Sequence, residues 1–494
     1  MSTTDTNALQ QCENEPLANS GLIQPNGVLL YIDKSSSEIC YASENAAGLL
    51  GEGPDDLLGL DGKDWLEQNL AGLVSWPASA GRRMHFPAGV DMGFGDLDVL
   101  ISGTSGGWIV EFEASQHSAV DLAGIRLARG AGRLDAAGLQ AMRQSLVDSV
   151  AKATGYDRVM LYQFDPDWSG DVLAEAVDAG RGSYLGLRFP ASDIPAIARN
   201  LYAQTPYRHI PDSAAAPVAI KSRAGTGTAL DLTWSDLRSV SPVHMQYLSN
   251  MHVLSSFSTS IMVDGKLWGL VACHDNTAKV IPLAAREHCK QLAAEFVQAM
   301  SEYRGSVQRE LYAAAVQAVE PIRSGVASGT ELGAAFEAQF PQLAALTGAS
   351  AAALFVGNQP QVWGPGPAGE TLTAIHDWCL KHQAEPVFAL DDLPAQTGLG
   401  SLPSSCGVLG VSVRAKQMNS ALVNLYLFRP EEAGEIAWAG NPNKPVEQAG
   451  DGQKLSPRSS FDKWVEVRNG HSRAWDEDAR FVGQQLRELL SASL

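Results

Sequence analysis

Several patterns that mark common classes of protein are missing from this sequence. Its six cysteines are scattered and form no CxxC pair, which argues against a zinc ribbon or a disulfide scaffold and favours a reducing cytoplasm. No uninterrupted apolar run reaches the roughly 20 residues that span a bilayer, and residues 1–11 are polar, unlike a secretory signal. The 36 basic residues form no long run and face 55 acidic ones, so the net charge of −19 disfavours nucleic acid or an anionic membrane as a partner.

Catalytic signatures are missing as well. The sequence has no glycine-rich phosphate loop, HExxH or GxSxG motif, so an enzyme with a cysteine or histidine centre has no support. His376 and His382, with five residues between them, have no partners at metal-ligand spacing and are expected at the surface. We therefore predict neither an enzyme nor a metal site.

The chain is long enough for several folded domains. At about 150 residues per domain, its 494 residues suggest about three. Hydrophobic residues make up 45% and charged residues 18%, which excludes a mainly disordered chain.

The first 120 residues predict an α+β domain. Short apolar runs at 28–32 and 39–41 flank a turn-like stretch, which is typical of a hairpin, and two more β-like runs follow at 97–101 and 108–112. A polar break at 115–119 ends this unit.

A second unit combines a helix with a sheet. An amphipathic stretch at 139–153 precedes four strand-like segments, at 158–164, 171–176, 256–263 and 267–273. The last two flank Asp264-Gly265, a strong hairpin signal. A long irregular stretch, 189–238, separates the first pair of strands from the last pair. Such a stretch inside a sheet domain favours a functional role.

A long helix and a third unit complete the pattern. Apolar residues recur at three- and four-residue steps over 283–319, which predicts a connector or dimer helix, either single or divided at Gly305. Strand-like segments at 351–356, 408–413 and 421–428 and a final helix at 476–490 follow. Between them a polar arm, 435–470, carries large aromatic residues that we expect to pack on another domain.

Five motifs stand in a fixed order along the chain. They are FPASDIP (189–195), SPVHMQYL (241–248), WGLVACH (268–274), PRSSF (457–461) and WVE (464–466). With Cys12 and the Ile23-Gln24-Pro25 lead, they closely resemble the bacteriophytochromes, in the order PAS, GAF, PHY. The resemblance covers essentially the whole chain. It implies an α+β fold of three tandem PAS/GAF-like domains, antiparallel sheets with flanking helices, joined by long helices.

The resemblance also implies domain boundaries and partners. It places a PAS domain with the attachment segment at 1–120, a GAF domain with the pocket at 121–305, and a PHY domain with a tongue at about 435–470 in 306–494. It implies a homodimer formed through the long helices and a C-terminal output module, such as a histidine kinase, that this sequence does not include. A trefoil-like passage of the segment near Ile23 through a GAF loop is a further expectation.

The implied ligand is biliverdin, a linear tetrapyrrole with a reactive vinyl group and two propionates. Cys12 would supply the thiolate that adds to the vinyl group, as self-modification rather than turnover. A lone cysteine near a terminus is otherwise more often inert. Cys273 is the second choice for the attachment.

Pocket roles follow from the same resemblance, residue by residue. The propionate-binding positions are Arg208, Arg238, Ser241, Ser256 and Ser258; arginine can hold a carboxylate through two parallel hydrogen bonds. Facing the rings are the Asp193 carbonyl beside Ile194, His244 through a water, His274 at ring D, and the aromatic residues Tyr162, Phe189, Tyr202 and Tyr247. Each histidine or aromatic residue alone would more often be structural.

The tongue motif implies how light is reported. Asp193 would pair with Arg458, Phe461 would belong to the same motif, and Trp438 and Trp464 would be alternates for one docking site. Isomerisation between Pr and Pfr would disturb the pair and switch the tongue between hairpin and helix.

Three residues depart from the family pattern. Asn26 stands where His is usual, and His252 and Ala439 stand where Gly is usual. The alternative is a GAF-type sensor of a cyclic nucleotide or other metabolite, which would leave Cys12 unmodified and need no tongue.

Overall fold

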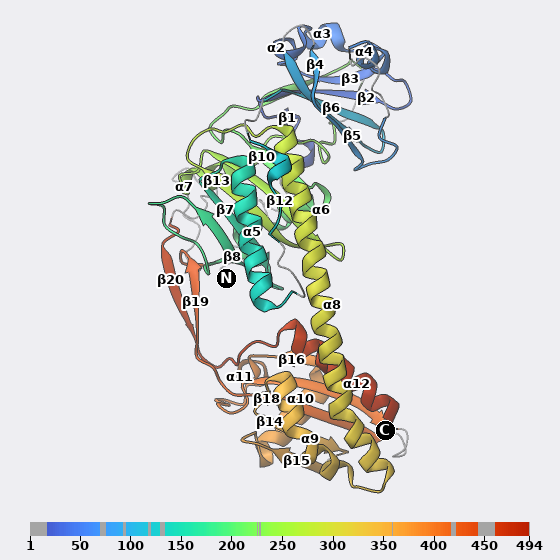
Figure 1. The fold of residues 1–494 in the computed structure, drawn as a ribbon, viewed down its shortest axis with the longest axis vertical. Helices are drawn as coiled ribbons and strands as arrows, with labels where there is room; N and C mark the ends of the chain where they lie inside the picture. Colours follow the sequence, from blue (N-terminus) through green and yellow to red (C-terminus); the bar gives the residue numbers. More distant parts are fainter. Residues whose placement is uncertain are drawn as a thin grey trace. The chain divides into compact units, whose positions relative to one another are not determined.

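A computed structural model describes most of the chain. The described residues are 17–69, 76–91, 95–116, 120–128, 134–224, 226, 229–357, 359–415, 421–442 and 460–493. They form helices and three sheets, which confirms the α+β expectation (Figure 1). Residues 1–300 with 437–464 pack as one compact unit, and residues 301–436 with 465–494 as another.

The first sheet has seven strands and includes the hairpin that the sequence predicts. Its strands in spatial order are β1 (Leu22–Ile23), β11 (Val218–Ser222), β3 (Ile39–Ser43), β2 (Gly27–Asp33), β6 (Gly107–Ala114), β5 (Asp96–Gly103) and β4 (Arg83–Asp91). Short helices α2 (Ala47–Leu50), α3 (Pro54–Leu57) and α4 (Gly62–Asn69) accompany it. Its core is apolar and includes Val28, Leu30, Val99 and Phe112, all fully buried.

The edge of this sheet is built by a segment from much later in the chain. β11 pairs antiparallel with both β1 and β3. Gln24 adds a backbone bond to the Leu237 carbonyl at 2.7 Å and a side-chain bond to the His209 carbonyl at 3.0 Å. The segment around Ile23 therefore lies against residues 209–239; the threading itself stays a prediction.

The second sheet has eight strands. In spatial order they are β10 (Tyr207–Ile210), β12 (Ser255–Val263), β13 (Lys266–Asp275), β7 (Arg158–Phe164), β8 (Gly170–Val177), β9 (Arg188–Phe189), β19 (Gly434–Ala439) and β20 (Lys463–Arg468). Asp264 and Gly265 both have positive φ, 51° and 74°, as a two-residue hairpin turn of the I′ kind requires.

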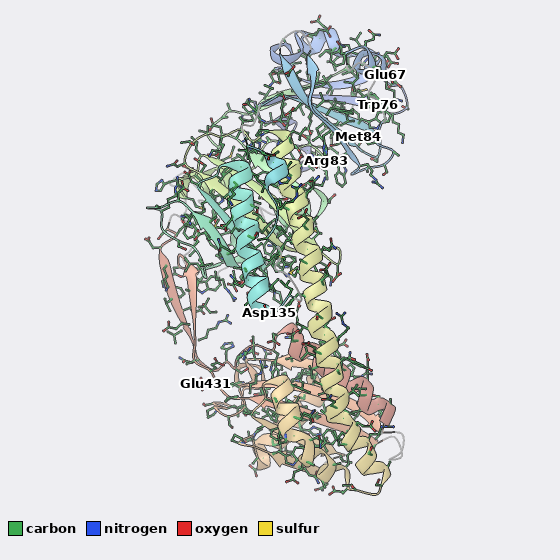
Figure 2. The ribbon with its side chains drawn as sticks, in the orientation of Figure 1. Glu67, Trp76, Arg83, Met84, Asp135 and Glu431 are labelled. Atoms are coloured by element: carbon green, nitrogen blue, oxygen red, sulfur yellow. The ribbon has the colours of Figure 1, made fainter. Side chains whose placement is uncertain are left out.

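Helices pack on this sheet. α5 (Ala136–Thr154) lies on β7 and β8 (Figure 1), and Asp135, labelled in Figure 2, caps its first turn by accepting from the Gly138 N–H at 2.7 Å. α6 (Ala196–Gln204) lies against β12 and β13, and α7 (Pro242–Asn250) follows later in the chain. Residues 189–238 thus contain short elements, including the 3₁₀ turn η3 (Ala191–Asp193), rather than one irregular loop.

The connector is a single helix, α8 (Leu283–Ala327), which continues through Gly305. The stripe predicted from the sequence is buried at Leu292, Phe296 and Met300. The described helices include none whose length and apolar character would let it cross a bilayer.

The third sheet has five strands with helices on both faces. Its order is β15 (Gln359–Trp363), β14 (Ala351–Val356), β18 (Ala421–Arg429), β17 (Gly407–Ala415) and β16 (Val387–Leu390). One core lies under α9 (Leu332–Thr347) and α12 (Glu477–Ser493), and the other under α10 (Gly369–His382) and α11 (Leu393–Thr397).

One surface prediction in this unit was wrong. His376 is only 4% exposed. Its ring stacks on Phe355 at 3.8 Å between centroids, and its Nδ1 lies 2.9 Å from the Tyr426 hydroxyl. The reason is its helical position, because Leu372, Ile375 and Cys379 place it on the buried stripe of α10. His382 is exposed, as expected.

Candidate functional site

Four of the expected site residues share one face of the second sheet. Arg208 lies directly opposite Ser258, and Ser256 lies directly opposite His274. Directly opposed residues point to the same side of a sheet, and so do residues two apart on one strand. β10, β12 and β13 therefore bring these side chains together.

Tyr202 joins this face from α6. Its hydroxyl lies 2.8 Å from the Ser258 Oγ, and burial raises its pKa. The same tyrosine packs against an apolar cluster with Tyr162, Phe189 and Ile194, in which Tyr162 and Phe189 meet edge-on at 6.1 Å between centroids. Three of the four aromatic residues expected around ring D thus gather in one cluster, and the fourth, Tyr247, contacts a member of that cluster, Phe461.

Two arginines, the buried Arg238 and the half-buried Arg208, lie close enough to influence each other. Burial, with the positive charge of Arg238, lowers the pKa of Arg208 to about 9, and burial also lowers the pKa of Arg238. Arg208 donates to the backbone carbonyls of Asp236 at 3.0 Å and Ser239 at 3.2 Å, and to that of Arg238. No carboxylate of the described residues forms a salt bridge with either guanidinium. The pair is suited to an incoming anion.

Ser241 begins the helix that carries His244. It caps α7 by accepting from the Val243 N–H at 3.2 Å, and Pro242 at the first position has the φ that a helix start needs. The His244 ring stacks on Tyr247 one turn later, with centroids 5.9 Å apart.

Both expected histidines are held neutral. Burial and the charge of Arg208 lower the pKa of His244 to about 4. Burial, Arg158 and His244 lower the pKa of His274 to about 3. His274 Nδ1 is a buried atom with no hydrogen-bond partner among the described residues. This nitrogen can accept a hydrogen bond from a ligand or donate one to it, depending on the tautomer.

Asp193 is linked to the arm 435–470 through Tyr247. The Tyr247 hydroxyl donates to Asp193 Oδ2 at 2.9 Å, and Phe461 meets the Tyr247 ring edge-on at 5.3 Å between centroids. Asp193 ends η3, and Pro190 and Pro195 on either side stiffen the backbone.

The arm adds strands to the second sheet. Trp438 on β19 pairs in parallel with Arg188 on β9, and the Arg188 guanidinium lies 6.0 Å from its ring centroid. Trp438 is buried, while Trp464 on β20 is half-buried. The aromatic packing expected of this arm is thus present for Trp438 and Phe461.

Two expected site residues, Cys12 and Arg458, lie outside the described residues. Cys273, the second choice for attachment, is buried on the side of β13 opposite to His274, and its pKa is raised by burial and by Cys289. A buried thiol with a raised pKa is a poor nucleophile, so Cys273 is disfavoured. The described residues contain no cluster of three or more His, Cys, Asp or Glu side chains suited to a metal.

The three departures each have a place. Asn26 donates to Glu113 Oε2 at 3.0 Å. His252 follows α7 with a φ of 57°, a left-handed conformation that glycine adopts without strain. Ala439 is fully buried in the apolar cluster that contains Phe189.

Sequence reasoning missed the acidic residues behind the arginines. Glu111 and Asp236 are buried, and Asp236 forms an ion pair with Arg83, which begins β4 and is labelled in Figure 2. A signal existed for Glu111, because a carboxylate inside the apolar run 108–112 needs buried partners.

Comparisons with known proteins cover nearly the whole chain. Residues 12–115 match the model of a PAS fold, residues 138–302 that of a GAF domain, and residues 319–494 that of the phytochrome region. The cyanobacterial phytochrome B of Nostoc sp. is 34% identical over 98% of this chain, and a bacteriophytochrome of Pseudomonas aeruginosa is 32% identical over 97%. This chain covers 66% of the length of each. The photosensory core module of a Stigmatella aurantiaca phytochrome has 32% identity, a TM-score of 0.82 and coverage of 97% of both chains.

Proposed function

The chain belongs to the phytochrome family and has its PAS, GAF and PHY domains, and from this we propose that it is a red/far-red photoreceptor that binds biliverdin covalently through Cys12. The boundaries at residues 120 and 305 are part of the proposal. So are a dimer formed through the long helices, a cytoplasmic location and a C-terminal output module such as a histidine kinase.

The arginine pair carries the proposal. The buried Arg238 and the half-buried Arg208 form no salt bridge with a carboxylate of the described residues, which leaves their positive charge without a direct ionic partner. Two propionates would balance it through charge-assisted bonds, with Ser256 and Ser258 supplying hydroxyls on the same face.

The other polar groups fit the same ligand. His274 Nδ1 needs a partner that a ring carbonyl could provide. The neutral His244 can accept through a water, since its pKa lies near 4. The apolar cluster with Tyr162, Phe189 and Tyr202 forms a shaped wall.

The residues would work as follows. Cys12 would hold the bilin covalently: its sulfur would bond to one vinyl carbon and the thiol proton would go to the other. The bound bilin supplies light absorption and isomerisation at the bridge before ring D. His274 and the tyrosines would hold ring D by hydrogen bonds, and Tyr247, which contacts both Asp193 and Phe461, would carry a change in those bonds to the tongue. An Asp193–Arg458 pair and an exchange of Trp438 for Trp464 complete the proposed switch.

The test is assembly with biliverdin. The purified chain should gain reversible red and far-red bands, and the pigment should survive denaturation in wild type and in Cys40→Ala but not in Cys12→Ala. Cys40 is a matched control because it is a half-exposed free cysteine. Pigment retained by denatured Cys12→Ala would move the attachment elsewhere. No uptake at all would favour the metabolite-sensing alternative.

A further inference from the structure

A carboxylate of the PAS domain reaches into the loop behind the arginine pair. Glu111 lies on β6 and is 1% exposed. Its Oε1 accepts from the Ser235 hydroxyl at 2.6 Å and from the Leu237 N–H at 2.8 Å, and its Oε2 accepts from the Asp236 N–H at 3.1 Å. Three donors from consecutive residues therefore converge on one side chain.

The same loop holds both arginines by its carbonyls. Arg208 donates to the carbonyls of Asp236 and Ser239, as described above, and Arg238 donates to those of Leu232 and Thr233, each at 3.1 Å. Arg238 is also tied at its backbone, since its N–H donates to Ser235 Oγ at 3.0 Å. Ser235 thus connects Arg238 directly to Glu111.

The loop is polarised between opposite charges. At Asp236 the N–H faces the Glu111 carboxylate and the carbonyl faces the Arg208 guanidinium. A carboxylate at the donor end and a cation at the acceptor end both stabilise this orientation of the peptide groups. An irregular loop without such an anchor has several conformations of similar energy.

We propose that Glu111 is a positioning residue for the bilin propionates: from the PAS domain it fixes the 232–239 loop, and the loop fixes the directions in which Arg208 and Arg238 point. The inference rests on the proposed function, because it assumes that these arginines receive propionates. It assigns to the PAS domain a part in ligand selection inside the GAF pocket.

Glu113 provides a matched comparison on the same strand. It lies two residues further along β6 and is also buried. It bonds instead to Arg286 on α8 at 2.7 Å and to Asn26 at 3.0 Å. Glu113→Gln neutralises a second buried carboxylate of the same strand, one paired with Arg286 instead of with the 232–239 loop.

The experiment compares biliverdin with its dimethyl ester, which lacks the two propionate charges. Binding is measured by titration in the full chain carrying Cys12→Ala, so that it stays reversible. Burial and the Asp236 charge raise the pKa of Glu111 to about 7, so the work is done at pH 8, where the carboxylate is about ten to one ionised. The readout is the ratio of the two dissociation constants, ester over free acid.

We expect Glu111→Gln to lower the ester-over-acid ratio of dissociation constants about tenfold, because one charge-assisted bond to a propionate is misdirected. The dissociation constant of the ester should stay within about threefold of the wild-type value. Glu113→Gln should leave the ratio unchanged. Ser235→Ala removes the hydroxyl bond to Glu111 and keeps the two N–H bonds, so the ratio should drop about threefold. If Glu111→Gln does not fold, this variant tests the inference in its place.

Equal weakening of acid and ester by Glu111→Gln would overturn the inference and leave a merely structural role. A ratio near one in the wild type would also overturn it, since the pocket would then not sense propionate charge. Failure of the wild-type chain to bind either pigment would refute the proposed function itself, which separates the two.

Discussion

Phe461 offers a direct test of the contact between the proposed tongue and the proposed bilin pocket. This partly buried residue packs edge-on against Tyr247, whose hydroxyl bonds to Asp193, and belongs to the apolar cluster with Phe189 and Ala439. Replacing it with alanine removes both the ring contact and the buried surface. We therefore expect Phe461→Ala to loosen strands β19 and β20 of the arm.

The size of the effect follows from two terms. An edge-to-face pair contributes about 0.5–1.5 kcal/mol, and burial of part of a phenylalanine side chain contributes about 1 kcal/mol. Together they give about 2 kcal/mol, which corresponds to roughly a 30-fold increase in the open population. Phe461→Leu keeps most of the burial and loses only the ring pair, so its increase should be about fivefold.

Hydrogen exchange at the Gly440 amide reports this opening. Its N–H donates to the Asp462 carbonyl at 2.9 Å and so links the end of β19 to the residue before β20. If exchange is limited by the open population, its rate rises by the same factors. Val467→Ala is the control, since Val467 on β20 is 60% exposed and its loss should change the rate less than twofold.

An unchanged Gly440 rate in Phe461→Ala would refute the argument, because the contact would then contribute nothing to tongue docking. Equal effects of the alanine and leucine variants would show that the ring geometry at Tyr247 is irrelevant and that burial alone matters.

Three further outcomes are expected. His252→Gly removes the strain of a left-handed non-glycine residue, which costs the folded state about 1–2 kcal/mol. Against this, glycine adds about 0.5–1 kcal/mol of chain entropy to the unfolded state, so the melting temperature should rise slightly. The control Ser249→Gly, inside α7, should lower it. The His274 pKa of about 3 in the folded protein lies below the unfolded value near 6.5, so the unfolded chain takes up a proton first as the pH falls. The wild-type apoprotein should therefore lose stability from pH 6.5 towards 4. His274→Gln should lose less over the same range, as measured by thermal melts. Tyr202→Phe and Ser258→Ala should show a coupling of about 1 kcal/mol in a double-mutant cycle, because they share the 2.8 Å bond; additive effects would mean that the bond adds nothing.

Local sequence signals predicted most of the secondary structure. The Asp264-Gly265 turn depends on two residues that tolerate positive φ, so the strands around it could be placed without tertiary information. The burial of His376 was also predictable locally, because its helical spacing from Leu372 and Cys379 places it on the same apolar stripe.

The site was less accessible to local reasoning. Arg208 and Arg238 are 30 positions apart, and nothing in their own spacing brings them together; the resemblance to a family did so. Their roles, with those of Cys12 and Arg458, stay predictions. The Glu111 contacts depend on PAS–GAF packing, so one sequence could not predict them. A carboxylate inside an apolar strand does indicate that buried hydrogen-bond donors lie nearby.

The pocket is supported from outside the GAF domain by two contacts of different strength. On the arginine side, Glu111 accepts three buried hydrogen bonds, and losing a buried charged partner typically costs several kcal/mol. On the Asp193 side, the link through Tyr247 to Phe461 is worth about 2 kcal/mol. Under the proposed function, a light-driven rearrangement would act first on the weaker contact, because a population shifts most readily where the opposing free energy is small. Under the proposed function, the propionates therefore stay anchored while the tongue responds, which assigns a fixed role to the PAS contact and a switching role to the aromatic one.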